Sequence, residues 1–189
     1  LQLIEAGADA FVIGEQKFGL RLPGEFTIAD VEKSVEIAHA AGKKVYVSVN
    51  ALFHNDRLDD LYAYMQEMER IQPDALLFGD PAVVMAVREL NITVPLHWSP
   101  ETIATNWFQV NYWAERGAKR AVLARELSME EVTEIKESAN AEIEVQVHGM
   151  TCMFQSKRSL LGNYFLYRDQ VMEVENRKDN KSMFLHDKE

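Results

Sequence analysis

Short apolar segments alternate along the chain with longer amphipathic segments. The apolar segments are rich in β-branched residues and continuously apolar inside, which is typical of strands covered on both faces. Amphipathic segments of about 10 to 15 residues between such strands are typical of helices that cross over between parallel strands. The pattern therefore predicts a parallel sheet with one helix after each strand. The predicted strands are 9–14, 44–50, 75–80, 94–99, 120–125 and 143–148.

Residue types at the predicted helix starts support this alternation. Thr27 with Asp30, and Ser128 with Glu131, have the spacing of a capping box, in which each residue's side chain binds the backbone amide of the other. Asp80-Pro81 places an N-cap residue before a proline at the first helical position, where a missing N–H does no harm. The helix expected after the second strand carries one apolar stripe that should face the sheet. This stripe consists of Leu58, Leu61, Tyr62, Met65 and Met68.

The opening residues 1–7 have the pattern of the last turns of a helix closed by Gly7. Such a helix needs a preceding strand, and eight strands close a barrel of this kind. We therefore expect an α/β fold, a parallel (β/α) TIM-like barrel of which about six strands are present and the first strand is missing. The N-terminally truncated barrel domain is predicted over 1–165. The highly charged residues 166–189 are predicted to form an irregular connection toward a missing C-terminal part.

Composition narrows the class of protein. Of the 189 residues, 47% are hydrophobic and 26% are charged, which is typical of a soluble globular chain with a sizeable core. No apolar run approaches the roughly 18 residues needed to cross a bilayer. The net charge of −10 gives no general attraction to anionic lipid or polyanions, so neither a membrane nor DNA is expected as a partner. A local basic patch at Lys157 and Arg158 still offers a contact for RNA phosphates.

Cys152 is the single cysteine. It allows no internal disulfide, no cysteine-based zinc site and no self-contained iron–sulfur site, and it favours a reducing compartment, so a cytoplasmic location is expected. A nucleophilic Cys152 would need a base such as His148 nearby, whereas a lone cysteine beside a strand end is more often a small packed residue. The sequence contains no recognised motif of serine hydrolases, zinc proteases, phosphate-binding loops or EF-hands.

Polar or ionisable side chains end nearly every predicted strand. Functional groups of parallel barrels gather at the carboxyl ends of the strands, so these side chains are expected around one mouth that binds a small polar or anionic ligand. No metal site is expected among them. The candidate ligand-binding residues are Lys17, Arg21, Asn50, Asp80, His97, Glu101, Arg125 and Glu126.

Several of these residues have a second interpretation. Arg125 and Lys17 are suited to hold an anion, because a guanidinium group matches a carboxylate and an ammonium group supplies a point charge. Arg125 fits a structural ion pair equally well, and Asp80 fits a simple helix cap. His97 and His148 are suited to acid–base catalysis or metal binding near neutral pH, but a buried histidine bonded to a carbonyl is the commoner outcome.

Residues 144–152 (EVQVHGMTC), followed by 160–165 (LLGNYF), resemble the signature of the peptidase U32 family. Glu144, Gly149, Cys152 and Leu161 match the family's pattern. Shorter resemblances occur at 7–10 with 18–21, at 45–50 and at 122–128, so the similarity extends from the first residues to about 165. The resemblance implies a barrel fold and makes His148, Cys152 and Glu144 the candidate catalytic residues.

The chain departs from the signature at several positions. Ser159 stands where the signature has a second cysteine, so the iron–sulfur cluster proposed for several relatives is not expected, and no cofactor is predicted within these residues. Further differences from the strict pattern occur at Gln146, Met150, Thr151, Lys157 and Gly162.

The family resemblance implies more than one function. Some members imply proteolysis, including collagenase-like activity, and others are linked to hydroxylation of RNA or quinones. The chain is most similar to a bacterial branch that works with a paired relative in prephenate-dependent hydroxylation of the wobble uridine of tRNA. The mouth with Arg125 and Lys17 suits a small dicarboxylate such as prephenate, which favours hydroxylation over a peptidase or hydrolase. A non-catalytic partner subunit is the third alternative.

Overall fold

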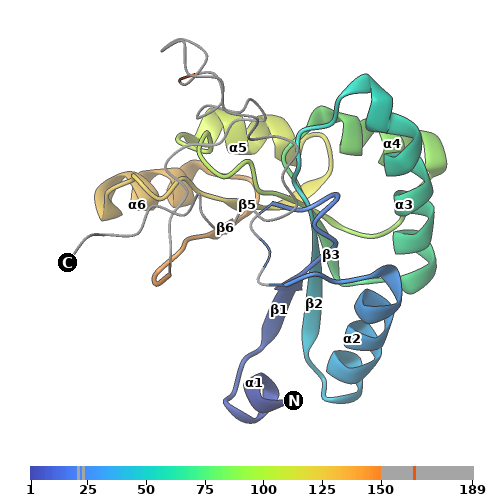
Figure 1. Ribbon diagram of the computed structural model, residues 1–189. Coiled ribbons are helices and arrows are strands. Elements are labelled where there is room, and N and C mark those ends of the chain that lie inside the picture. The colour runs from blue at the N-terminus through green and yellow to red at the C-terminus, as the bar shows by residue number, and fades with distance from the viewer. Residues whose placement is uncertain (21, 23, 150–163, 165–189) are drawn as a thin grey trace. The chain divides into compact units, whose positions relative to one another are not determined.

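The computed structural model describes residues 1–20, 22, 24–149 and 164, and residues 1–151 form one compact unit. Its six strands lie side by side in sequence order, and every neighbouring pair is parallel. The sheet curls, and the main helices lie along its outer side, as in part of a TIM-like barrel (Figure 1). The predicted α/β class and the parallel order are thereby confirmed. The predicted domain boundary at 165 lies outside the described residues and stays a prediction.

The strands have the following bounds: β1 Ala10–Ile13, β2 Lys44–Val49, β3 Ala75–Phe78, β4 Leu96–Trp98, β5 Ala118–Val122 and β6 Glu142–Glu144. The helices are α1 Gln2–Glu5, α2 Ile28–Ala40, the 3-10 helix η1 Asn55–Arg57, α3 Leu58–Ile71, α4 Pro81–Leu90, α5 Trp107–Ala114 and α6 Met129–Ser138. No helix in the described part of the chain is long and apolar enough to cross a membrane.

The last two strands differ from the prediction. β5 begins and ends earlier than the predicted 120–125, because the backbone after Val122 leaves β4 and Ala124 N donates instead to Ala104 O in the following loop (3.0 Å). β6 ends at Glu144, so the predicted strand 143–148 is wrong after Glu144. Val147 there is 91% exposed, which shows that an apolar residue alone does not extend an edge strand.

Local sequence signals fix the helix starts as predicted. Both capping boxes form, at the starts of α2 and α6, and Asp80 caps α4 ahead of Pro81. In α3 the buried residues include Leu61, Met65 and Met68 of the predicted stripe. Tyr64 is buried in place of the predicted Tyr62, whose hydroxyl donates to Glu89 on α4 (2.6 Å).

The sheet has two chemically different faces. Its outer face packs against the helices and contains the large apolar core, with Val47, Phe78 and Trp98 fully buried. The inner face has a small cluster of Tyr46, Ala75 and Leu77 and several buried polar residues. The prediction of continuously apolar strands is therefore wrong for this face, because every second position points inward. The buried polar residues are Ser48, Asn50, His97 and Ser99.

Candidate functional site

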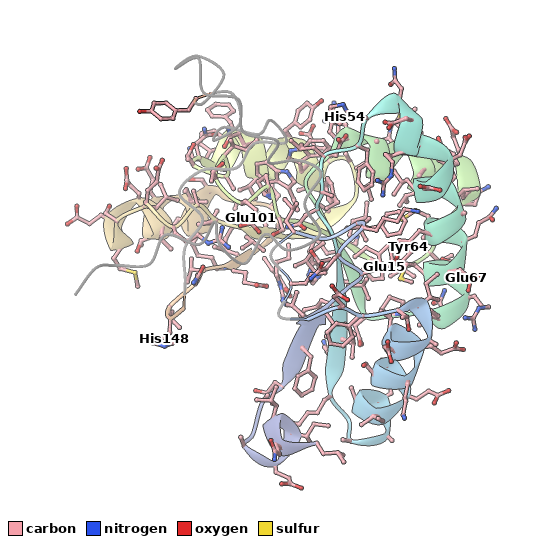
Figure 2. All side chains as sticks on the ribbon, in the orientation of Figure 1. Glu15, His54, Tyr64, Glu67, Glu101 and His148 are labelled. Atoms are coloured by element: carbon pink, nitrogen blue, oxygen red, sulfur yellow. The ribbon has the colours of Figure 1, made fainter. Side chains whose placement is uncertain are left out.

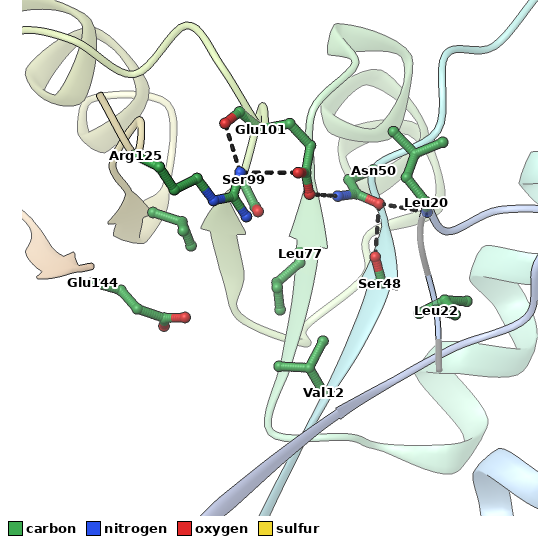
Figure 3. A pocket seen from close by; sticks show the side chains of 11 residues that line it. Val12, Leu20, Leu22, Ser48, Asn50, Leu77, Ser99, Glu101, Arg125 and Glu144 are labelled. Carbon is green, nitrogen blue, oxygen red and sulfur yellow. Dashed lines mark hydrogen bonds and ion pairs between the residues drawn. The ribbon is translucent and has the colours of Figure 1, made fainter. Parts of the chain in front are cut away.

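A cavity of about 230 Å³ lies on the inner face of the sheet toward the carboxyl ends of the strands (Figure 3). Three of the predicted ligand-binding residues, Asn50, Glu101 and Arg125, line it together. Glu144, a predicted catalytic residue, also lines it. The remaining lining residues are Val12, Leu20, Leu22, Ser48, Leu77, Ser99 and Val122.

A chain of hydrogen bonds joins the ends of three strands at this cavity (Figure 3). Asn50 Nδ2 donates to Glu101 Oε1 (3.1 Å), and Glu101 Oε2 forms an ion pair with Arg125 Nη1 (2.9 Å). The side chains of Arg125 and Glu101 are only 16% and 11% exposed, so water screens their attraction weakly. The ion-pair interpretation of Arg125 is thus correct, and the residue also faces the cavity.

Arg125 is held by more than its ion pair. Its Nη1 donates to the backbone O of Glu101 (2.7 Å), and its Nε donates to Gln146 Oε1 beyond β6 (2.7 Å). These partners occupy Nε and Nη1, and Nη2 makes no hydrogen bond with the residues that the structure describes. The guanidinium group is therefore fixed in direction and retains a donor for a ligand.

Glu101 has an unusual backbone conformation. Its φ of 70° lies in the left-handed region, which costs a non-glycine residue about 1 kcal/mol or more. This conformation turns the carbonyl toward Arg125 while the carboxylate bridges Asn50 and Arg125. The contacts of Glu101 therefore stabilise a conformation that the residue would not adopt alone.

The loop between β1 and α2 closes one side of the cavity. A Cβ on Gly14 or Gly19 would lie 2.9 or 2.8 Å from the backbone O of Ser48, so only glycine permits this approach. Leu20 N donates to Asn50 Oδ1 (2.9 Å), which also accepts a hydrogen bond from the Ser48 hydroxyl (2.7 Å). Asn50 thereby connects the loop to Glu101.

A second ion-pair group lies deeper on the inner face. Arg120 of β5 pairs with Glu142 (2.7 Å) and with Glu144 (3.1 Å), the latter of which lines the cavity. His97 is 6% exposed and stacks edge-on against Tyr46 (4.9 Å between ring centroids). Burial, and then the charge of Arg120, lower the pKa of His97 to about 4, so the ring is neutral near pH 7. His97 does not line the cavity.

Other predicted ligand-binding residues lie outside the cavity. Lys17 pairs with Asp60 on α3 (2.8 Å). Asp80 accepts from Ala82 N and Phe53 N (2.9 Å each), so its observed role is that of a helix cap and loop anchor. Glu126 is exposed in the turn after Arg125. Arg21 lies outside the described residues.

The predicted catalytic residues are only partly placed. His148 is exposed at the tip of the segment after β6, away from Glu101 (Figure 2). Its backbone O accepts from Gln146 Nε2 (3.3 Å). Cys152 lies outside the described residues, so its proposed pairing with His148 stays a prediction. Within the described ranges, no group of three or more His, Cys, Asp or Glu side chains is arranged to hold a metal.

The sequence-based prediction did not include Ser48, Ser99 or Gln146 among the site residues. Ser48 precedes Asn50 by two positions and Ser99 precedes Glu101 by two, so each pair points to the same face of its strand. That spacing is the signal that could have identified the two serines. Gln146 follows the shortened β6, where the strand prediction failed.

A curled parallel sheet with a polar cavity toward the carboxyl ends of its strands defines a TIM-like α/β barrel protein. The chain belongs to peptidase family U32, whose family model matches residues 1–172. Among solved structures, that of the U32 peptidase Mk0906 superimposes with a TM-score of 0.64 at 17% identity, over 94% of this chain and 76% of that one. This likeness shows the fold.

Curated relatives carry more specific names. The tRNA hydroxylation protein P2 of Bacillus subtilis (strain 168) is 59% identical over the whole chain, which spans 61% of that protein. The tRNA hydroxylation protein P of Escherichia coli (strain K12) is 40% identical over 86% of the chain and 36% of that protein. Protein P1 of the same Bacillus subtilis strain is 36% identical over 88% of the chain and 40% of that protein. The chain thus spans less than two thirds of each of these relatives.

Proposed function

We propose that this chain is the barrel part of a protein that takes part in prephenate-dependent 5-hydroxylation of the wobble uridine in tRNA. The observation that carries this proposal is the 59% identity, over the whole chain, to a protein named for tRNA hydroxylation. The protein would act in the cytoplasm, with tRNA as its macromolecular partner.

The cavity supplies a binding site for the small ligand of this proposal. Among the described residues, Arg125 is the one lining residue with a positive charge, and its fixed guanidinium group suits a carboxylate such as those of prephenate. Lys17 does not contribute to this cavity, because its ammonium group is paired with Asp60 on α3. Ligand binding in this proposal therefore depends on Arg125.

A paired relative from the same family is the expected protein partner. Bacillus subtilis has both a protein P1 and a protein P2, and each is similar to this chain. Two related proteins in one organism are consistent with two subunits that have different roles in one reaction. The non-catalytic alternative, in which this chain only supports its partner, predicts that substitutions in the cavity leave hydroxylation intact.

The peptidase alternative has less support. It rests on the family name, and in the described part of the chain no serine hydroxyl is hydrogen-bonded to a histidine. His97 is buried beside Arg120 with a lowered pKa, which does not suit a general base that must reach a peptide. Cleavage of gelatin by the purified full-length protein, lost on alkylation of Cys152, would favour this alternative.

The test is nucleoside analysis of tRNA from a deletion strain. Loss of 5-hydroxyuridine derivatives, restored by the full-length gene, is the expected result. Complementation with Arg125→Ala should fail, whereas Arg88→Ala, a change at an exposed arginine on α4, should restore the modification. An unchanged nucleoside profile in the deletion strain would refute the proposal, and full activity of Arg125→Ala would remove Arg125 from the site.

A further inference from the structure

The cavity wall contains a hydroxyl group with no hydrogen-bond partner among the residues that the structure describes. Ser99 is 4% exposed and lines the cavity at the end of β4. Its backbone N donates to Phe78 O (2.7 Å), but its hydroxyl makes no hydrogen bond with the described residues. Buried hydroxyl groups in proteins are almost always hydrogen-bonded. A group that faces the cavity in this state is suited to bind a ligand.

Arg125 offers a second unused donor on the same wall. Ser99 and Arg125 follow neighbouring parallel strands, and Figure 3 draws both at the cavity. The Nη2 group of Arg125 and the Ser99 hydroxyl are donors without partners in the described ranges. Two donors in the lining of one cavity suit the two oxygens of a carboxylate.

The charges around the cavity limit how much negative charge it accepts. Arg125 is already paired with Glu101, and a second arginine of the inner face, Arg120, is paired with Glu142 and Glu144. Glu144 itself lines the cavity, so a second carboxylate placed inside would meet a negative charge, and the described lining residues include no further cation to offset it. The lining therefore favours one carboxylate.

The rest of the lining is apolar. Leu20, Leu77 and Val122 are three of the five aliphatic residues that complete the wall. Contact with an apolar ring would remove these side chains and the ring from water, which stabilises the bound state. A ligand with one carboxylate next to a six-membered carbon ring matches both parts of the lining.

We infer that Arg125 Nη2 and the Ser99 hydroxyl bind a single carboxylate of a ring-containing carboxylic acid, whose ring lies against the aliphatic wall. The inference rests on the proposed function in one respect, since it says how prephenate would be held: one of its two carboxylates enters the cavity and the other remains outside. Ser99 is then a determinant of ligand specificity.

The experiment measures ligand binding to the full-length protein by calorimetry. The probes are prephenate, phenylpyruvate, which carries one carboxylate at the end of a short side chain on its ring, and inorganic phosphate. Ser99→Ala should raise the Kd of phenylpyruvate about tenfold, the usual effect of losing one hydrogen bond to a charged group. Ser34→Ala, on α2 and remote from this cavity, is the matched control and should leave the Kd unchanged. Circular dichroism should show the same folded signal for both variants.

The possible results separate the inference from the proposed function. Phenylpyruvate should compete with prephenate, and phosphate should not. Equal Kd values for Ser99→Ala and Ser34→Ala, binding of prephenate without binding of phenylpyruvate, or competition by phosphate alone would each overturn the inference. None of these results depends on tRNA. If the deletion strain keeps its 5-hydroxyuridine derivatives while Ser99→Ala still weakens phenylpyruvate binding, the proposed function fails and the carboxylate site stands.

Discussion

Replacement of Asn50 tests whether the hydrogen-bonded chain at the cavity stabilises the fold. Asn50 is 5% exposed and satisfies three groups: Leu20 N, the Ser48 hydroxyl and the carboxylate of Glu101. Asn50→Ala removes two neutral hydrogen bonds of about 1 kcal/mol each and one to a charged group of about 1.5 kcal/mol or more. Since water can enter the cavity and replace part of this loss, we expect destabilisation by about 3 kcal/mol.

Urea unfolding of the full-length protein measures this loss. Asn55→Ala, which changes an exposed asparagine in η1, is the control and should alter the free energy of unfolding by less than about 0.5 kcal/mol. Equal stability of the two variants would show that the Asn50 contacts contribute no net energy, and the reasoning would be refuted.

Asn50→Asp separates hydrogen bonding from packing. The new oxygen would face Glu101 Oε1, which lies 3.1 Å from Nδ2 in the native residue. Two carboxylates this close hold a shared proton, so one pKa rises above its value in the unfolded chain. The free energy of unfolding of the variant should therefore be closest to that of the native protein near about pH 4. The difference between the two should grow as the pH rises through the raised pKa. A deficit that is constant between about pH 4 and pH 8 would contradict this account.

Three further predictions concern single residues. Gly19→Ala places a Cβ 2.8 Å from Ser48 O and should destabilise the protein by about 1 to 3 kcal/mol in urea unfolding, whereas Gly24→Ala, with 3.6 Å to its nearest neighbour, should cost less. Burial lowers the pKa of His97 to about 4, so the unfolded chain binds a proton first and stability falls as the pH drops from about 6.5 toward 4. His97→Gln should lose about 2 to 3 kcal/mol less than the native protein over that interval, and identical pH profiles would argue against this. Glu144→Gln removes a negative charge from the cavity and should tighten phenylpyruvate binding severalfold in calorimetry; weaker binding would show that the carboxylate contacts the ligand favourably.

Residue parity explains the positions of Asn50, Glu101 and Asp80, but not that of Arg125, which lines the cavity three positions after the inward-facing Val122. Asn50 lies two positions after the inward-facing Ser48, and Glu101 lies two positions after Ser99, so the strand-end rule places both at the cavity. Two positions after the inward-facing Leu77 lies Gly79, which has no side chain. Asp80 is one position further, so its side chain points to the opposite face and caps α4. A list of polar strand ends does not distinguish these cases, because the direction of a side chain depends on where the strand begins.

The wrong strand prediction after Glu144 has a different cause. The apolar residues Val145 and Val147 favour a strand, but β6 has only one neighbour, β5, in the described sheet and ends at Glu144. Sequence patterns report burial, and burial at an edge depends on what packs beyond it. For the same reason the spatial relation of His148 to the cavity could not be inferred from its spacing after Glu144.

The hydrogen-bonded residues at the cavity follow strands in the interior of the sheet. Asn50 follows β2, Glu101 follows β4 and Arg125 follows β5, and each of these strands has a neighbour on both sides. The position of Glu101 is further fixed because Ala124 N, next to Arg125, donates to Ala104 O in the loop that contains Glu101. Ligand donors mounted on paired strands and held by mutual hydrogen bonds require little reorganisation on binding. The carboxylate site at Arg125 and Ser99 therefore depends on strands in the interior of the sheet. Val12 and Glu144 line the cavity from the edge strands β1 and β6. They are 44% and 36% exposed, so the cavity is open on their side.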